Sequence, residues 1–368
     1  MSLDPARDAE IRAFLARHGW GDAERHALAQ DASTRRYERL ARGGDTGMLM
    51  DAPGRGEDPP CPPDADPDTR RRLGWNATSR LAASRVDAFV ALARHLKALG
   101  LSAPDIIAAE PDRGLAIVED LGAGLVADTL TRDRALEPQL YGLTGGLLAH
   151  VQRTAVPDAL PVDETGSDWP LLRFDDVALS ANIDLFADWL PVFVGRDAMS
   201  EAERAEWKAR RDDLVAALSA QPHALTLRDV HAENLIWRPD RDGLSRIGLL
   251  DFQDAVIGPR AWDLSMLLHD ARRDVSETAH EAALAGYLDA SGQSDERLRR
   301  DLAVAGLANT LRIIGIFARL ISRDGKTRYG TFLPREWGHL ARILETPGLA
   351  AFAPMVEIGA PGWRRHAA

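Results

Sequence analysis

Residues 227–264 constrain the fold of this chain more than any other part of it. They read LRDVHAENLIWRPDRDGLSRIGLLDFQDAVIGPRAWDL, and two short apolar pieces, Leu235–Trp237 and Ile247–Leu250, enclose a polar turn. This pattern is typical of a β-hairpin. Asp263 follows a Gly-Pro pair and opens the next helical pattern. The segment therefore predicts a short hairpin with polar side chains at both of its ends.

Three oxygen-bearing side chains in this segment suit one kind of chemistry. Asp229 lies five residues before Asn234, and Asp251 ends the second strand. Transfer of a phosphoryl group to an alcohol needs an aligned hydroxyl, an acceptor for its proton and cations that neutralise the triphosphate. Mg²⁺ prefers oxygen ligands, so a carboxylate and an amide oxygen are suitable donors. Either motif alone is usually a capped turn, and it is their order around the hairpin that indicates phosphoryl transfer.

The first 120 residues alternate between helical and strand-like patterns. Asp4-Pro5 is a good helix start, because a capping side chain precedes a proline at the first helical position. We then expect strands at 36–42 and 47–52, a long mobile proline-rich loop at 53–85, a helix at 86–99 and a strand pair at 106–107 and 115–118. This order predicts a small α+β unit around an antiparallel sheet.

The rest of the chain has a different character. After Glu119–Gly122 the pattern changes to helices, of which those at 201–218, 301–321 and 334–345 are clear. We therefore predict an α+β protein with two lobes. The first covers residues 1–121 and contains the sheet, and the second covers residues 122–368 and is mainly helical.

The composition argues against several classes of partner. The formal net charge is −11, whereas a duplex-binding protein needs a basic face to displace counterions. We find neither an apolar run of bilayer-spanning length nor a signal-peptide core. One cysteine, Cys61, cannot form an intrachain disulfide, which suits a reducing compartment. We predict a cytoplasmic protein that binds neither nucleic acid nor membrane.

The segment around Asp229 resembles the Brenner-type motif of the aminoglycoside phosphotransferase and choline kinase family, relatives of the protein kinases. DASTRRY at 31–37 with MLMDAP at 48–53, and DFQDA at 251–255, are similar to one subgroup, the bacterial anomeric sugar kinases. The resemblance implies a protein-kinase-like two-lobed fold, with ATP and Mg²⁺ as cofactors. It also implies a small-molecule acceptor, the C1 hydroxyl of N-acetylmuramate or N-acetylglucosamine, in cell-wall recycling.

The resemblance implies a role for each matching residue. Asp229 would be the catalytic base or the carboxylate that orients the hydroxyl, and Asn234 and Asp251 would hold Mg²⁺. Asp263 would brace the catalytic loop through its backbone, and His231 would support the same loop.

The resemblance also indicates where the nucleotide would bind. The segment from Glu119 through Leu121 to Gly122 would be the hinge that meets the adenine edge through main-chain groups. Ser33 and Arg36 fall where a phosphate-covering loop should be, so backbone N–H groups and a guanidinium would meet the triphosphate there.

The chain departs from the family pattern in three places. Leu227 stands where the wider family has a histidine two residues before the catalytic aspartate. The second strand of the first hairpin has no lysine for the phosphates, and Asp51 lies about where it would be. The helix at 86–99 offers no glutamate for the usual ion pair. Another cation, Arg36 or one of the arginines at 70–72, must then act on the phosphates.

The acceptor is the part of the function that the residues constrain least. A cationic acceptor would need carboxylates or an aromatic cage, and the candidate acids Asp175, Asp176, Asp184 and Asp188 have the spacing of a solvated helix face. A neutral or anionic amino sugar would use Gln253 and Asp254, with Lys326 for a carboxylate. Two alternatives stay open: an aminoglycoside or amino-alcohol kinase, and a pseudokinase that binds nucleotide or a partner without turnover.

Overall fold

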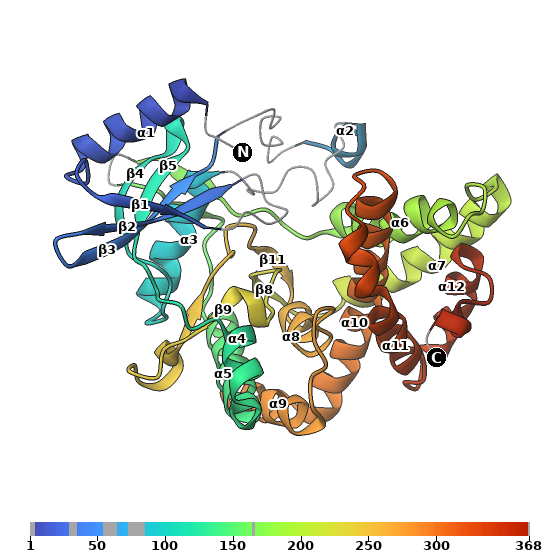
Figure 1. The fold of residues 1–368 in the computed structure, drawn as a ribbon. Helices are drawn as coiled ribbons and strands as arrows, with labels where there is room; N and C mark the ends of the chain where they lie inside the picture. The colour runs from blue at the N-terminus through green and yellow to red at the C-terminus, as the bar shows by residue number, and fades with distance from the viewer. Residues whose placement is uncertain (1–3, 29–34, 54–64, 73–84, 164–165, 367–368) are drawn as a thin grey trace.

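A computed structural model shows how the chain folds. It describes residues 4–28, 35–53, 65–72, 85–163 and 166–366, so the predicted site residue Ser33, like Cys61, lies outside the described residues. Figure 1 shows a small N-terminal sheet beside a larger, mainly helical part. This is the two-lobed α+β arrangement that the sequence predicts, and the boundary at residue 121 stays a prediction.

The N-terminal sheet has five antiparallel strands in the order β1-β2-β3-β5-β4. Both predicted hairpins are present, and the turn at Gly43 and Gly44 uses positive φ at both glycines, +55° and +99°. The strands are β1 (Glu24–Ala27), β2 (Arg36–Arg42), β3 (Asp45–Asp51), β4 (Ile106–Glu110) and β5 (Leu115–Val118).

One helix covers each face of this sheet, and the alternation along the strands explains why. Leu49 packs with α1 (Pro5–Arg17), whereas its neighbour Met50 packs with α3 (Val86–Ala98). Successive residues of a strand point to opposite faces, so an apolar run gives two apolar faces. At the start of α1, Asp4 accepts a hydrogen bond from Ala6 N at 3.1 Å, as its position before proline predicts.

The larger part is mainly helical and holds three short strand pairs. Its hairpin β9–β10 begins at the predicted residues, and β8 pairs with β11 just before and after it. The helices are α4 (Val126–Arg132), α5 (Glu137–Arg153), α6 (Asp176–Phe193), α7 (Glu201–Ser219), α8 (Ala261–Leu268), α9 (Glu277–Ser291), α10 (Asp295–Ser322), α11 (Leu333–Leu344) and α12 (Ala353–Gly359). The strands are β6 (Ala159–Pro161), β7 (Asp168–Pro170), β8 (His223–Thr226), β9 (Leu235–Trp237), β10 (Ile247–Leu249) and β11 (Val256–Pro259).

Main-chain hydrogen bonds fix the β9–β10 hairpin beside the N-terminal sheet. Trp237 N donates to Gly124 O at 2.7 Å, just beyond the segment that the sequence assigns to the hinge. Leu249 N donates to Ser102 O at 2.9 Å, in the segment between α3 and β4. The hairpin that ends in Asp251 is therefore held to both sides of the junction between the two parts.

Two sequence predictions about regular structure are wrong. The stretch 53–85 is not all loop, because α2 (Pro67–Arg72) forms within it. Asp66 accepts hydrogen bonds from Asp68 N at 2.9 Å and Thr69 N at 2.8 Å, so local capping outweighs the proline-rich composition. The strand β1 was not predicted either; its four residues are mostly exposed, so they show no apolar alternation.

The helix α10 corrects the expectation about apolar runs. Among the described residues it is the one helix long and apolar enough to cross a membrane, judged by length and composition alone. Of its most apolar window, however, 72% is buried inside the protein. A helix in the core of a globular protein has the same length and composition.

Candidate active site

The loop between β8 and β9 is held by one buried carboxylate. Asp263, at the start of α8, accepts hydrogen bonds from Leu227 N at 2.6 Å and Arg228 N at 2.8 Å, and its side chain is inaccessible to solvent. Arg228 has a φ of 79°, a conformation that costs a non-glycine residue about 1–3 kcal/mol. The two bonds hold the backbone in this turn, so the geometry fits the predicted bracing by Asp263.

Asn234 and His231 close the other end of this loop. Asn234 Nδ2 donates to Asp229 O at 2.9 Å, lies 3.1 Å from His231 Nε2 and lies 3.5 Å from Asp251 Oδ2. Burial, with the positive charge of Arg272, lowers the pKa of His231 to about 4, so its ring is neutral at physiological pH. The structure thus brings Asp229, Asn234 and Asp251 together, as the sequence predicts.

Asp251 is partly buried and surrounded by polar groups. It follows β10 with a φ of 55°, and its Oδ1 accepts hydrogen bonds from an Arg35 guanidinium nitrogen and from Gln253 Nε2, the latter at 3.0 Å. Burial alone would raise the pKa of Asp251, but the charge and hydrogen bond of Arg35, with Gln253 and His231, bring the pKa below its usual value. The Asp251 carboxylate is therefore ionised.

These groups fit a divalent cation that arrives with a nucleotide. Asp251 offers an ionised oxygen, and because Asn234 Nδ2 is engaged by the loop, its amide oxygen is the atom left to face a cation. Within the described part of the chain, no group of three His, Cys, Asp or Glu side chains could hold a metal by itself. A bound ion would need further oxygens from the nucleotide and from water, which is how Mg²⁺ is usually held.

Arg35 is the cation that the sequence analysis missed. It lies just before β2 on the sheet side, is 8% exposed, and reaches across to Asp251 and to Gln253 Oε1 at 2.6 Å on the helical side. Tyr37 Oη lies 3.2 Å from the same guanidinium. Both Arg35 and Arg36 belong to the DASTRRY motif, and only the structure distinguishes them.

The cations predicted for the phosphates were Arg36 and one of the arginines at 70–72, of which the side chains at 71 and 72 lie outside the described residues. Arg36 and Arg70 have other partners. Arg36 Nη2 lies 2.9 Å from Asp51 Oδ2, and Arg70 Nη2 donates to Asp175 Oδ1 at 2.8 Å. Their charges are thus already matched by carboxylates. Of these three arginines, Arg35 is the one that contacts Asp251.

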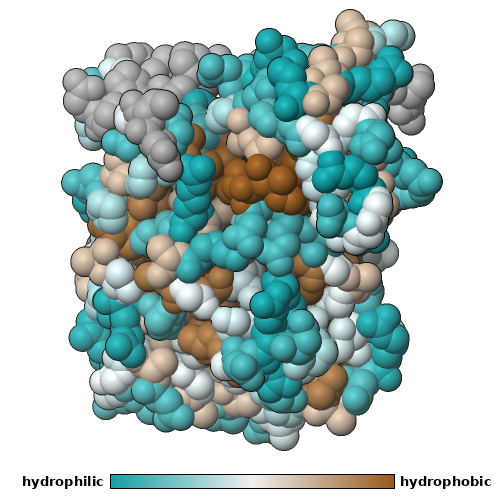
Figure 2. Space-filling view, turned by 90° about the vertical axis from the view of Figure 1, so that its left-hand side faces the viewer, coloured by the Kyte–Doolittle hydropathy of each residue, from teal (hydrophilic) through white to brown (hydrophobic). Residues whose placement is uncertain are grey.

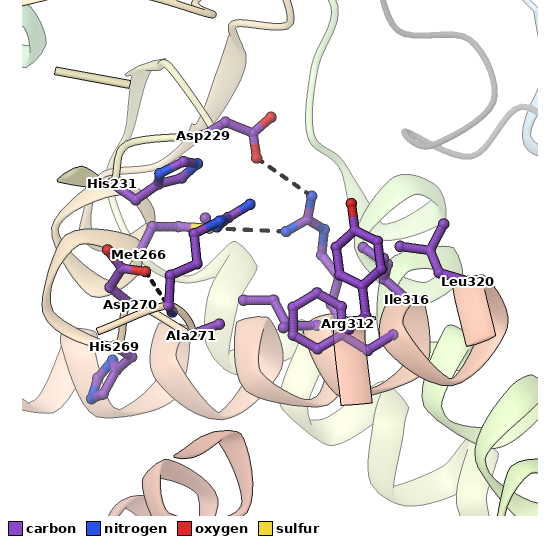
Figure 3. A pocket seen from close by; sticks show the side chains of 13 residues that line it. Asp229, His231, Met266, His269, Asp270, Ala271, Arg312, Ile316 and Leu320 are labelled. Carbon is purple, nitrogen blue, oxygen red and sulfur yellow. Dashed lines mark hydrogen bonds and ion pairs between the residues drawn. The ribbon is translucent and has the colours of Figure 1, made fainter. Parts of the chain in front are cut away.

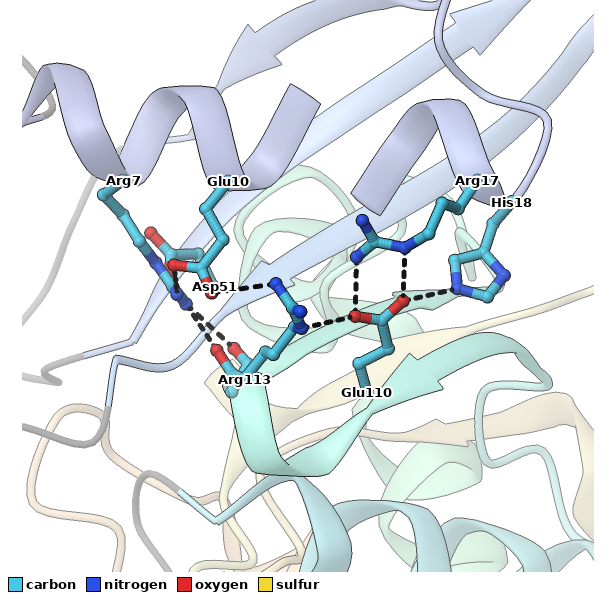
Figure 4. A network of polar contacts seen from close by, with 8 residues as sticks. Arg7, Glu10, Arg17, His18, Asp51, Glu110 and Arg113 are labelled. Carbon is cyan, nitrogen blue, oxygen red and sulfur yellow. Dashed lines mark hydrogen bonds and ion pairs between the residues drawn. The ribbon is translucent and has the colours of Figure 1, made fainter. Parts of the chain in front are cut away.

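Asp51 has a structural reason for standing where a lysine was expected. It is 2% exposed, and Arg7 of α1 donates to its Oδ1 from Nε at 3.0 Å and from Nη2 at 2.8 Å (Figure 4). Arg7 also donates to the main-chain oxygen of Arg113 at 2.9 Å. Arg7 and Arg36 together match the buried carboxylate, so Asp51 joins α1 to the sheet.

The predicted hinge joins β5 to α4 by a polar turn. Glu119 N donates to Asp105 O at 2.8 Å, and the Glu119 carboxylate pairs with Arg238 Nη2 at 3.0 Å. Leu121 is 8% exposed and packs toward Gly248 of β10. Figure 2 shows the face of the molecule nearest the sheet, with strongly apolar side chains gathered and recessed in its upper half. The adenine-binding role of Glu119 and Leu121 stays a proposal.

A pocket opens beside Asp229. Figure 3 shows the Asp229 carboxylate and the Arg312 guanidinium pointing toward each other, with Arg312 Nη2 3.9 Å from Asp229 Oδ1. A second guanidinium, Arg272, also lines the pocket. The complete lining is Asp229, His231, Met266, His269, Asp270, Ala271, Arg272, Arg312, Ile313, Ile316, Phe317, Leu320 and Tyr329.

None of the three residues predicted for substrate contact belongs to the lining of this pocket. Gln253 bonds Arg35 and Asp251 instead, and Lys326 lies in the turn after α10, where its main-chain nitrogen donates to Leu320 O at 3.0 Å. Asp254 lies close to Asp229 and Asp251 electrostatically. The pocket is lined by the motif residues Asp229 and His231, by residues 266–272 and by one face of α10, which comes from a distant part of the chain. The substrate contacts predicted for Gln253, Asp254 and Lys326 stay predictions.

Asp254 gives the protein a specific dependence of stability on pH. Burial, with the charges of Asp229 and Asp251, raises the pKa of Asp254 to about 7 against the opposing charge of Arg228. The pKa of an aspartate in an unfolded chain is about 3.9. Between these values the folded protein holds a proton that the unfolded chain has released, so stability falls as the pH rises through this window.

We therefore expect wild type to lose stability relative to Asp254→Asn as the pH rises from about 4 to about 7, by up to about 1.4 kcal/mol per pH unit. Thermal melts of both proteins across this range measure the difference. Because Asp263 titrates in the same way in both proteins, its effect cancels in the comparison. Parallel melting curves for the two proteins would contradict the assignment.

The comparisons with known proteins agree with this geometry. A family model described as "Phosphotransferase enzyme family" matches residues 24–302. A curated relative from Caulobacter vibrioides, named N-acetylmuramate/N-acetylglucosamine kinase, is 48% identical over 352 residues, which cover 95% of this chain and 96% of the relative.

Two solved structures share the fold. A choline/ethanolamine kinase family protein from Mesorhizobium loti has a TM-score of 0.56 at 18% identity, and the match covers 96% of this chain and 99% of that one. An ADP-bound aminoglycoside phosphotransferase, APH(2″)-Ib, has a TM-score of 0.55 at 12% identity, with 97% and 99% covered. The protein-kinase-like fold that the sequence predicts is confirmed, and the chain belongs to the phosphotransferase enzyme family.

Proposed function

We propose that this chain is an ATP-dependent kinase that phosphorylates the anomeric hydroxyl of an N-acetylated amino sugar. Membership of the phosphotransferase family supports the reaction type, and the Caulobacter vibrioides relative, a kinase named for N-acetylmuramate and N-acetylglucosamine, supports the acceptor. The observation that carries the proposal is the pocket at Asp229, which two carboxylates, Asp229 and Asp270, and two guanidinium groups line.

The position of Arg312 favours a neutral or anionic acceptor. Asp229 and Asp270 line the pocket together with Arg272 and Arg312, and Arg272 pairs with Glu233 at 2.8 Å. An aminoglycoside or a choline-like acceptor would bring a positive charge against the Arg312 guanidinium. A sugar offers hydroxyl and carbonyl oxygens, and muramate adds a carboxylate, all of which accept hydrogen bonds from arginine. The candidate acids Asp175, Asp184 and Asp188 are paired with Arg70, Arg211 and Arg204, respectively.

In the proposed mechanism each residue has one duty. Asp229 accepts the proton of the sugar hydroxyl as the phosphoryl group is transferred. The Asp263 carboxylate holds the loop of Asp229 in place by accepting hydrogen bonds from two main-chain nitrogens. Asp251 and Asn234 would hold Mg²⁺, which supplies charge neutralisation of the triphosphate when bound. Arg35 fixes the Asp251 carboxylate and keeps a positive charge beside it.

The substitution at Leu227 fits turnover rather than a pseudokinase. Leu227 is 2% exposed and packs in the core, while its main-chain nitrogen donates a hydrogen bond to the Asp263 carboxylate. The loop is thus braced without the histidine that the wider family has at this position. Asp229, Asn234 and Asp251 also lie together, an arrangement that a module without catalysis does not need.

A coupled ADP-release assay over a panel of acceptors tests the function. We expect Mg-dependent turnover of N-acetylglucosamine and N-acetylmuramate, and little turnover of kanamycin or choline. Phosphorus NMR of the product should show an anomeric phosphate. Turnover of the cationic acceptors with silence on every N-acetylhexosamine would remove the proposal, and silence on all acceptors together with a failure to bind Mg-ATP would favour the pseudokinase.

A further inference from the structure

Arg312 is an unusual residue for its position in the fold. It lies in the middle of α10, the one helix of the described chain long and apolar enough to cross a membrane, and it is 7% exposed. Burying an arginine in such a place costs free energy unless its N–H groups are hydrogen-bonded and its charge is paired with a carboxylate or a ligand. Leucine or methionine would fill the same space at less cost, so the guanidinium indicates a function at the pocket.

Two buried amide groups hold the Arg312 guanidinium in one orientation. Its Nε donates to Asn182 Oδ1 at 3.0 Å, and its Nη1 donates to Asn309 Oδ1 at 3.1 Å. Asn182 is inaccessible to solvent and is fixed in turn, because its Nδ2 donates to Ala178 O at 2.8 Å. A Cβ at Gly315 would lie 2.3 Å from the main-chain carbon of Leu185, so α10 and α6 approach closely enough for this network.

The partners of Arg312 leave Nη2 without a hydrogen bond among the described residues. Nε and Nη1 donate to the uncharged Asn182 and Asn309, whereas Nη2 forms only an ion pair with the Asp229 carboxylate, whose Oδ1 lies 3.9 Å away, beyond hydrogen-bonding distance. Nη2 therefore faces the pocket beside Asp229 with a donor that a bound molecule can use. An oxygen atom of a bound molecule would find a strong, pre-oriented donor there.

The same face of α10 is apolar beyond the guanidinium. Ile313, Ile316, Phe317 and Leu320 line the pocket with Arg312, and they follow it at the spacing of one helix face. The pocket thus places a cationic donor next to a small apolar wall. A carbonyl group that carries a methyl is complementary to this pair of features.

We propose that Arg312 recognises the acetamido group of the acceptor and determines the preference for N-acetylated sugars. The C1 hydroxyl and the C2 acetamido group of such a sugar are on adjacent carbons. A donor for the carbonyl oxygen must then lie within a few ångströms of the group that takes the hydroxyl proton, as Arg312 does from Asp229. The apolar residues of α10 receive the methyl. This inference rests on the proposed function.

The proposal predicts an order among three acceptors that differ at C2. N-acetylglucosamine gains the hydrogen bond, glucose lacks it, and glucosamine places an ammonium group against the guanidinium. Wild type should therefore use them in that order of kcat/KM. A hydrogen bond to a charged group contributes about 1.5–3 kcal/mol, so the N-acetyl preference over glucose should be roughly 10- to 100-fold.

Substitution of Arg312 separates recognition from a structural role. In Arg312→Gln and Arg312→Met we expect the preference for N-acetylglucosamine over glucose to fall by roughly 10- to 100-fold, and use of glucosamine to improve relative to glucose. KM for ATP should stay near wild type. Arg319→Gln is the matched control, because Arg319 lies on the same helix outside the pocket lining, and it should keep the wild-type order.

Several outcomes would overturn the inference. Equal losses on all three acceptors would mean that Arg312 acts only through Asp229 or through folding, and thermal melts of each variant identify the second case. Wild type alone provides a test that does not depend on variant folding: equal kcat/KM for N-acetylglucosamine and glucosamine excludes the proposed contact. Failure of the proposed function is distinct, because wild type would then use no N-acetylhexosamine.

Discussion

Replacement of Asp229 by asparagine should lower kcat by about 10²- to 10⁴-fold while leaving the affinity for Mg-ATP nearly unchanged. Asparagine keeps the shape of the side chain but cannot accept the proton of the acceptor hydroxyl. Asp229 lies at the pocket beside Arg312, whereas the groups proposed for the metal are Asn234 and Asp251. The loss should thus fall on the chemical step and spare nucleotide binding.

Single-turnover rates and isothermal titration with Mg-ATP measure these two quantities separately. The matched control is Asp240→Asn, an exposed aspartate in the turn between β9 and β10 that should retain wild-type kcat. A variant of Asp229 with nearly full kcat would show that another group takes the proton. A variant that no longer binds Mg-ATP would show that this carboxylate serves the nucleotide instead.

The second large effect is expected at Asp251. Asp251→Asn should abolish the part of ATP affinity that depends on Mg²⁺, because it replaces the ionised carboxylate proposed as a metal ligand with a neutral amide. The same change removes the ion pair between Asp251 and Arg35. Because the Asp251 side chain is partly exposed, we expect the loss of stability to be smaller than the about 3–5 kcal/mol typical of a fully buried pair. Both losses should therefore appear in one variant, in nucleotide titrations with and without Mg²⁺ and in thermal melts.

A double variant separates these two losses. Arg35→Gln with Asp251→Asn removes both charges, so part of the stability should return while Mg-dependent ATP binding stays absent. Asp274→Asn is the matched control, since Asp274 also pairs with an arginine, Arg335, but on an exposed part of the surface. Mg-dependent binding that persists in Asp251→Asn would exclude this carboxylate as a ligand.

The parts of the site that the sequence predicts are those made by one continuous segment. Asp229, Asn234, Asp251 and Asp263 lie within the segment 227–264, and a hairpin between them leaves little choice about where they meet. The α+β character of the first part was also predictable, because strand alternation and helix periodicity are local patterns. A helix or strand that buries one or both of its faces shows this in the pattern of its own residues, so a short stretch of sequence is enough to predict it.

The residues that sequence reasoning missed act across long separations. Arg35 and Asp251 are 216 positions apart, and Arg312 and Asn182 are 130 apart. No local periodicity carries such a pairing. One signal was available for Arg312: a charged residue inside the apolar pattern of 301–321 has to be explained by a partner or a ligand. Arg35 and Arg36 are neighbours in an extended chain, so the sequence predicts that their side chains point in opposite directions. It does not predict which of the two contacts Asp251.

The contact between α1 and Asp51 changes where this protein can be trimmed. The match to the family begins at residue 24, so a version shortened to that point would lack Arg7 and leave an interior carboxylate with Arg36 alone. We therefore expect the residues before position 24 to contribute to the stability of the sheet. Amino-terminal truncation should destabilise the part that contains the five-stranded sheet first, although it deletes no residue proposed for phosphoryl transfer.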